Sequence, residues 1–191
     1  MKRTVLISLA VIAVQAPALG HGDATPSRFN VLLSGGSEQN VIRIWLSPDG
    51  RDYVIASIVQ LEVGGTVCTH PEGMPNALVC EARSIASFEV NAGAGDDRIV
   101  VARKVAVPVT LRGGPGDDVL VGGGGGDKLL GGSGHDALTG RGGEDALYGG
   151  SGNDRMFGGS GVDICNGGPG RDFAASCEVR RRVRSAPSGS S

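Results

Sequence analysis

An aspartate recurs at every ninth residue between residues 113 and 175 of this 191-residue chain. Seven copies of one nonapeptide follow each other there without a gap, among them GGPGDDVLV, GGSGHDALT and GGSGNDRMF. The sixth residue of every copy is aspartate: Asp118, Asp127, Asp136, Asp145, Asp154, Asp163 and Asp172. A carboxylate that always follows a glycine-rich run at a fixed period indicates a stack of metal-binding turns.

The residue types in these turns favour one metal. Glycine adopts backbone angles that other residues cannot, so a tight turn of glycines can aim its carbonyl oxygens at one point. Carbonyl and carboxylate oxygens are hard ligands that suit Ca²⁺, which takes about 6–8 of them. No His or Cys recurs with the period, so zinc, copper and iron lack their preferred ligands. The pattern therefore predicts several bound calcium ions.

An eighth, imperfect copy precedes the seven. It runs from Ala92 to Val100, keeps Asp97 and Ile99, and is separated from Gly113 by the insert VARKVAVPVTLR. We interpret this as one wider coil of 21 residues in which the insert supplies an extra strand. The predicted calcium ligands are the turn aspartates together with the glycines at the second and fourth positions of the repeat: Asp97, Gly114, Gly116, Asp118, Gly123, Gly125, Asp127, Gly132, Gly134, Asp136, Gly143, Asp145, Gly150, Gly152, Asp154, Gly159, Gly161, Asp163, Gly168, Gly170 and Asp172.

Two nonapeptides per coil would stack aspartates that lie 18 residues apart, about 4.8 Å from each other. This predicts two ladders, one of Asp118, Asp136, Asp154 and Asp172 and one of Asp127, Asp145 and Asp163. An ion between each adjacent pair gives five sites, and Asp97 above Asp118 gives a sixth. Without ions the ladders hold like charges together, so we expect the repeats to be largely unfolded until calcium binds.

The elements that must position these turns are short strands. The second residue after each aspartate is usually large and apolar, which predicts an inward column and a thin core between two sheets: Leu120, Leu129, Leu138, Leu147 and Met156. A disordered glycine-rich linker would not keep this register. In the last two copies Cys165 and Ala174 take the apolar position, so the core thins out there.

The N-terminal part also has a strand pattern, and no segment has sustained helical periodicity. Strands are expected at Phe29–Leu33, Asn40–Leu46 and Tyr53–Ile58, with Ser47–Gly50 as the turn of a hairpin. Val63–Cys68 and Leu78–Cys80 flank a loop that contains Pro and Gly. Because each repeat buries its apolar face only against neighbours, we expect this part to cap the stack.

The N-terminus has the features of a secretory signal. Lys2 and Arg3 precede an apolar stretch from Val5 to Val14, and cleavage after Ala18 or Gly20 fits the small-residue rule. The apolar run is too short for a bilayer, so no stable membrane span is expected after cleavage. The predicted organisation is a signal peptide (1–20), a β-rich cap (21–91), the roll (92–177) and a disordered basic, Ser-rich tail (178–191).

Four cysteines in an exported chain indicate disulfides. Cys68 and Cys80 are 12 residues apart, as are Cys165 and Cys177, so two local bridges are the simplest of three pairings. A zinc site of Cys68, His70 and Cys80 is the rival interpretation. It lacks the CxxC spacing.

The nonapeptide closely resembles the RTX, or haemolysin-type, calcium-binding repeat, GGxGxDxUx, and the resemblance covers residues 92–100 and 113–175. It implies an all-β fold, a right-handed parallel β-roll (β-solenoid) with Ca²⁺ between its turns. Arg141 replaces a second glycine and Ala92 a first, so these two turns are expected to bind more weakly. Many family members use an uncleaved C-terminal export signal, from which this chain departs. Its layout is similar to small secreted calcium-binding proteins of actinomycetes.

An enzyme is not expected, because HExxH and GxSxG are absent and the only His residues, His21, His70 and His135, lie far apart. Nucleic acid is a poor partner, because the seven repeats carry nine acidic and four basic side chains. The sequence predicts a secreted calcium-binding protein. The alternatives are a calcium-dependent cell-surface or adhesion module, and a small secreted hydrolase that uses the repeats as a folding aid. For the basic tail, a contact with an anionic cell-surface polymer is the alternative to a solvated end.

Overall fold

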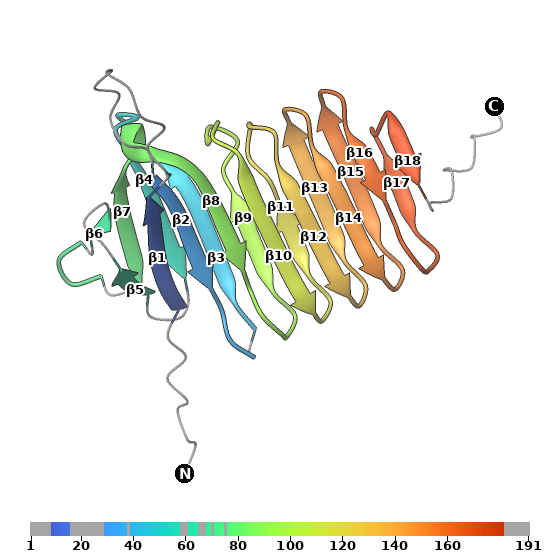
Figure 1. Ribbon diagram of the computed structural model, residues 1–191, viewed down its shortest axis with the longest axis horizontal. Coiled ribbons are helices and arrows are strands. Elements are labelled where there is room, and N and C mark those ends of the chain that lie inside the picture. Colours follow the sequence, from blue (N-terminus) through green and yellow to red (C-terminus); the bar gives the residue numbers. More distant parts are fainter. Residues whose placement is uncertain are drawn as a thin grey trace, which may run out of the picture.

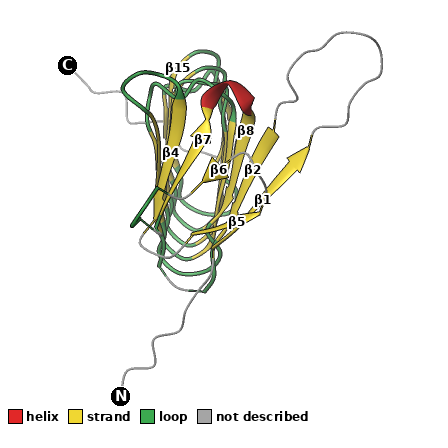
Figure 2. Ribbon diagram, turned by 90° about the vertical axis from the view of Figure 1, so that its left-hand side faces the viewer, coloured by secondary structure: helices red, strands yellow, loops and turns green. Residues whose placement is uncertain are grey.

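From β8 (Ile85–Asn91) onward, successive strands alternate between two facing sheets, so this part of the chain winds as a flattened coil (Figures 1 and 2). The computed structural model describes residues 9–15, 29–37, 39–57, 61–64, 68–69, 71–74 and 76–181. Within this part, each sheet has nine strands. Their orders are β18-β16-β14-β12-β10-β8-β2-β1-β5 and β17-β15-β13-β11-β9-β3-β4-β7-β6. The predicted all-β roll is confirmed.

The roll itself is entirely parallel. Its strands are β8 (Ile85–Asn91), β9 (Arg98–Val101), β10 (Val109–Pro115), β11 (Val119–Val121), β12 (Lys128–Ser133), β13 (Ala137–Gly142), β14 (Ala146–Ser151), β15 (Arg155–Ser160), β16 (Ile164–Asn166), β17 (Phe173–Ala175) and β18 (Val179–Arg181). Leu120 pairs with Leu138, which confirms the period of 18 residues. Val109 pairs with Phe88, which confirms the wider coil of 21 residues and the extra strand from the insert.

The N-terminal part continues both sheets. β2 (Phe29–Ser34) lies parallel to β8, and β3 (Val41–Leu46) lies parallel to β9. Antiparallel strands then end the parallel stack, with β4 (Asp52–Ser57), β7 (Ala77–Glu81) and β6 (Cys68–Thr69) beyond β3, and β1 (Leu9–Gln15) beside β2. β5 (Leu61–Gly64) lies parallel to β1, and η1 (Ala82–Ser84) is a single 3-10 turn. The predicted hairpin and the capping role are confirmed.

Two columns of apolar side chains form the core between the sheets. The register aligns Ile42, Ile99, Leu120, Leu138, Met156 and Ala174 in one column, and Leu33, Val90, Leu111, Leu129, Leu147 and Cys165 in the other. Every one of these side chains has 0% exposure. Tyr53 and Phe88 enlarge the core at the N-terminal end, where their rings meet edge to face at 5.2 Å. The core narrows toward Ala174, as predicted.

Both predicted disulfides are present, Cys68–Cys80 and Cys165–Cys177. The first removes both thiolates from the rival zinc site, and His70 lies outside the described residues. Among the described residues, no helix has the length and apolar character needed to cross a membrane.

The two ends of the chain bear on the predicted boundaries. β1 lies inside the predicted signal peptide, while both cleavage positions and residues 21–28 lie outside the described residues. Cleavage at either position would remove β1 from its sheet. Because the described residues do not include the cleavage positions, the signal peptide stays a prediction. At the other end, Val179–Arg181 pairs with β16. The predicted start of the tail at residue 178 is therefore wrong, because these residues still extend a sheet; residues 182–191 lie outside the described part.

Candidate metal centre

All eight predicted aspartates are buried in the turns that connect the two sheets. Their exposed fractions lie between 0% and 3%: Asp97, Asp118, Asp127, Asp136, Asp145, Asp154, Asp163 and Asp172. Parallel strands in an 18-residue register place equivalent turns directly above one another, on two sides of the roll. Asp127, Asp145 and Asp163 lie on one side and the other five on the opposite side. The structure thus brings the aspartates of each predicted ladder together, with one ladder on each side of the roll.

One carboxylate oxygen of each aspartate holds the ladder in register. Oδ1 of Asp136 accepts the backbone N–H of Asp118, and Oδ1 of Asp154 accepts that of Asp136. The N–O distances between consecutive repeat aspartates are 2.8–3.0 Å on both sides. Hydrogen bonds to a buried carboxylate are charge-assisted and strong. Each aspartate therefore fixes the coil above it.

The second carboxylate oxygen has a different environment. Among the described residues, seven Oδ2 atoms are buried without a hydrogen-bond partner: those of Asp97, Asp118, Asp136, Asp145, Asp154, Asp163 and Asp172. A buried polar atom without a partner costs about 1–3 kcal/mol, and more when it is charged. Seven such atoms at equivalent positions point to a shared ligand, and a cation satisfies a carboxylate oxygen.

These turns require glycine for two reasons: the backbone has a positive φ, and a Cβ atom would overlap the neighbouring coil. Gly132 has φ +130° and Gly150 has φ +115°. A Cβ on Gly132 would overlap the carbonyl oxygen of Gly114, and a Cβ on Gly150 would overlap that of Gly132. The same relation links Gly116, Gly134 and Gly152. Carbonyl oxygens of the predicted ligand glycines thus stack in rows beside the carboxylates.

In the first six repeats, the first glycine packs against the aspartate of its own repeat. A Cβ on Gly131 would overlap Oδ2 of Asp136, and the same holds for Gly149 and Asp154. The carboxylate therefore folds back over its own turn, with Oδ2 near the backbone.

The turn from Gly122 to Asp127 departs from this pattern. Oδ2 of Asp127 accepts the N–H of Gly123 at 2.7 Å, and neither Gly123 nor Gly125 has a positive φ. The cause lies in the coil above, where the insert replaces a repeat and its Val105 carbonyl faces Gly123. Asp127 is therefore the one repeat aspartate here whose Oδ2 already has a partner.

Burial raises the pKa of these carboxyl groups. It raises the pKa of Asp136 and of Asp127 to about 7, and that of Asp118 and of Asp145 to about 6. Desolvation is the largest cause in every case. The neighbouring aspartates of the ladder raise the pKa of Asp136 further. The fold without metal therefore penalises the charged carboxylates, and a divalent cation removes this penalty.

The sequence interpretation missed an upper end of the first ladder. The sequence GGSEQN at residues 35–40 is a further degenerate copy of the repeat, in which Asn40 takes the aspartate position and Ile42 the inward apolar position; Glu38 lies outside the described residues. The Asn40 backbone N–H and Nδ2 both donate to Oδ1 of Asp97, and Nδ2 also donates to the Ala92 carbonyl. The doublet Gly35-Gly36 five residues before Asn40 is the signal that could have revealed it.

A lower end of the second ladder was also missed. Oε2 of Glu178 accepts the N–H of Asp163 at 2.6 Å, and the Val179 N–H bonds to the Asp163 carbonyl, as Ile164 does with Asp145. Glu178 therefore occupies the aspartate position that follows Asp163 in the ladder, at the end of a coil that is three residues shorter than the others. No periodic search finds it, because the spacing from Asp163 is 15 residues.

A separate, exposed ladder runs along the rim at the fifth turn position. The His135 N–H donates to Oδ1 of Asp117, and His135 Nδ1 accepts the Asn153 N–H at 3.0 Å. The Arg171 N–H donates to Oδ1 of Asn153. His135 is exposed, and through these two hydrogen bonds it bridges the coils above and below it.

The donor set fits calcium. In the described part of the chain, no group of three or more His, Cys, Asp or Glu side chains gathers at one point. A metal here must take most of its ligands from backbone carbonyls, with a carboxylate from each turn. Ca²⁺ accepts such all-oxygen sets, whereas zinc, copper and iron prefer nitrogen and sulfur.

Residues 110–138 and 139–174 match the family model of the RTX calcium-binding nonapeptide repeat, in four copies. The matched segment is therefore an RTX β-roll. The turns at Gly35–Asn40 and Ala92–Asp97 lie before it, and Glu178 lies after it. No curated protein and no solved structure matches the chain.

Proposed function

We propose that this chain is a secreted calcium-binding protein whose roll binds about five or six Ca²⁺ ions and folds on binding them. The observation that carries the proposal is the row of buried Oδ2 atoms without a hydrogen-bond partner. Each ion would lie between consecutive turns, where it would contact the carboxylates of both turns and the carbonyl oxygens of the stacked glycines.

The ladder geometry supports the number of ions. Five aspartates on one side enclose four gaps, from Asp97 to Asp172, and three on the other side enclose two. Asn40 ends the first ladder with amide hydrogen bonds in place of a carboxylate. The Asp127 gap is expected to be the weakest, because Oδ2 of Asp127 already accepts a hydrogen bond.

Coupling of binding to folding follows from the same geometry. The core between the sheets is only two columns of apolar side chains wide, and the aspartate ladders lie in the turns at its two edges. The charged ladders oppose folding until cations arrive, and the many glycines add an ordering cost of about 0.5–1 kcal/mol each relative to alanine. A structural, non-catalytic role agrees with this design, because the metal ligands are used to hold coils together.

Calcium titration of the purified chain by calorimetry, with parallel circular dichroism, tests the proposal. We expect a stoichiometry of about five or six and a cooperative gain of sheet signal. The same sheet content in excess chelator and in millimolar calcium would contradict folding on binding. N-terminal sequencing of the exported protein tests the cleavage after Ala18 or Gly20.

A further inference from the structure

Three departures from the nonapeptide pattern meet at one place on the outer face of the β9-containing sheet. They are Arg141, which replaces a glycine; the insert after Val100, which supplies Arg103; and β3, which supplies Arg43 and Trp45. Together they line an open cavity of about 550 Å³. A volume of this size is within the range of small-ligand sites.

The strand register explains how these residues come together. Arg43 on β3 pairs with Val100 on β9, and Trp45 follows two residues later on the same face, opposite the buried Ile42 and Ile44. Arg141 lies on β13, two strands from β9, yet its Nη1 donates to the Val101 carbonyl. The Arg141 side chain therefore extends across β11 toward Arg103 and the cavity.

The cavity carries positive charge that the protein does not neutralise. The ion pairs of the described residues involve Arg51, Arg83 and Arg112, and none involves the three arginines of this cavity. Arg141 is half-buried and Arg43 and Arg103 are exposed, and three like charges around one open cavity favour an anionic ligand.

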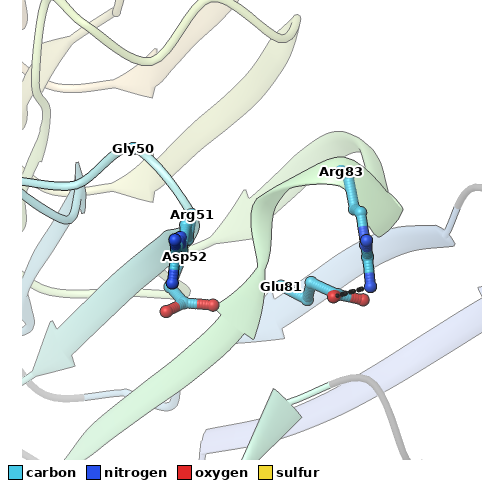
Figure 3. A pocket seen from close by; sticks show the side chains of 5 residues that line it. All are labelled: Gly50, Arg51, Asp52, Glu81 and Arg83. Carbon is cyan, nitrogen blue, oxygen red and sulfur yellow. Dashed lines mark ion pairs between the residues drawn. The ribbon is translucent and has the colours of Figure 1, made fainter.

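A second cavity provides a contrast. It is lined by Gly50, Arg51, Asp52, Glu81 and Arg83 and has a similar volume of about 530 Å³ (Figure 3). There Arg83 pairs with Glu81 at 2.6 Å, and Arg51 lies 3.8 Å from Asp49. Its arginines already have carboxylate partners, so it has no comparable excess of positive charge.

The backbone at Arg141 adds an independent observation. Arg141 has φ +87°, a conformation that favours glycine and that equivalent turns fill with glycine, such as Gly132 and Gly159. A non-glycine residue in this region costs about 1–3 kcal/mol and is commonly found at functional sites. The chain thus keeps an arginine where glycine would fit better.

We infer that this cavity binds an anionic carbohydrate, with its oxyanion on the guanidinium groups of Arg43, Arg103 and Arg141 and its sugar ring on Trp45. Guanidinium groups hold carboxylates and phosphates with two parallel hydrogen bonds. The half-buried indole presents a flat apolar face beside them. The oxyanion is a carboxylate in a uronic acid and a phosphate in a sugar phosphate, and both carry the required chemistry.

Trp45 is the only tryptophan of the chain, so its fluorescence reports the site directly. The experiment titrates the calcium-loaded full chain with glucuronate, glucose 6-phosphate and neutral glucose. We expect at least one of the two acids to change the fluorescence saturably, with the preference between them identifying the oxyanion. Glucose is expected to have no effect at the same concentration, and added salt is expected to weaken binding.

Arg141→Gly restores the repeat glycine and should fold at least as well as the natural chain. It should bind the acid about tenfold or more weakly, and so should Arg103→Gln. Arg155→Gln, an exposed arginine away from the cavity, is the matched control and should bind normally. The inference is overturned if neither acid binds, if glucose binds equally well, or if Arg141→Gly keeps full affinity. Calcium binding by these variants is measured separately, so failure here leaves the calcium proposal intact.

Discussion

Asp136→Asn is expected to stabilise the fold without calcium and to destabilise it with calcium. Asparagine has the shape of aspartate and keeps the oxygen that accepts the Asp118 N–H at 2.9 Å. What the substitution removes is the charge and the unpartnered Oδ2. Because Asp136 lies between Asp118 and Asp154, it borders two of the proposed ions.

The size of the stability gain without metal follows from the pKa of Asp136. Burial raises the pKa of Asp136 from 3.8 to about 7, which corresponds to about 4 kcal/mol against the charged form in the fold. Above pH 7 the neutral asparagine escapes this cost. The variant should therefore be more stable than the natural chain in excess chelator, by up to about 4 kcal/mol.

With calcium the stability change reverses its sign, because Asp136→Asn removes a calcium ligand at two sites. Asp172→Asn, at the lower end of the same ladder, loses a ligand at one. The assay is the sheet content by circular dichroism in chelator, the unfolding transition in millimolar calcium, and the stoichiometry from calorimetry. Glu144→Gln, an exposed acid in a neighbouring turn, is the matched control. Equal losses for Asp136→Asn and Asp172→Asn in calcium, or destabilisation by Asp136→Asn in chelator, would refute shared ions between stacked carboxylates.

Without calcium, the folded form keeps its protons at higher pH than the unfolded chain, since burial raises the carboxyl pKa values to about 6–7. Lowering the pH from 7 toward 4 should therefore stabilise the metal-free fold and weaken calcium binding; metal-free stability that rises with pH would contradict this. Replacing Cys165 and Cys177 by alanine opens a local loop and should cost about 3 kcal/mol in thermal unfolding, and an unchanged midpoint would argue against a stabilising clamp. Gly132→Ala forces a side chain at φ +130° and should destabilise the roll by about 1–3 kcal/mol or more, whereas Gly142→Ala, which meets only a flexible serine, should have a small effect in the same measurement.

Much of the roll follows from the sequence because a repeat protein contacts mainly its own neighbours. A fixed period of nine puts each aspartate and each inward apolar residue in register with the residue two copies away. Asp118 over Asp136, Leu120 beside Leu138 and the 21-residue coil between Phe88 and Val109 could therefore be derived by counting.

The ends of the ladders could not be derived in this way. Asn40 and Glu178 occupy aspartate positions only because strands β3 and β18 pair with the roll, and neither residue has the spacing of the repeat. The different state of Asp127 likewise depends on the insert folding over Gly123.

The sequence by itself determined the buried carboxylate ladders, their glycine turns and the metal that suits them, since these depend on local geometry repeated at one period. Only the tertiary structure decided what stops the ladders and what lies outside the pattern. Arg43, Arg103 and Arg141 are up to 98 residues apart in the sequence, and they meet only because each coil advances the chain by one strand spacing. Stacking thus turns distant exceptions to the repeat into neighbours on one surface.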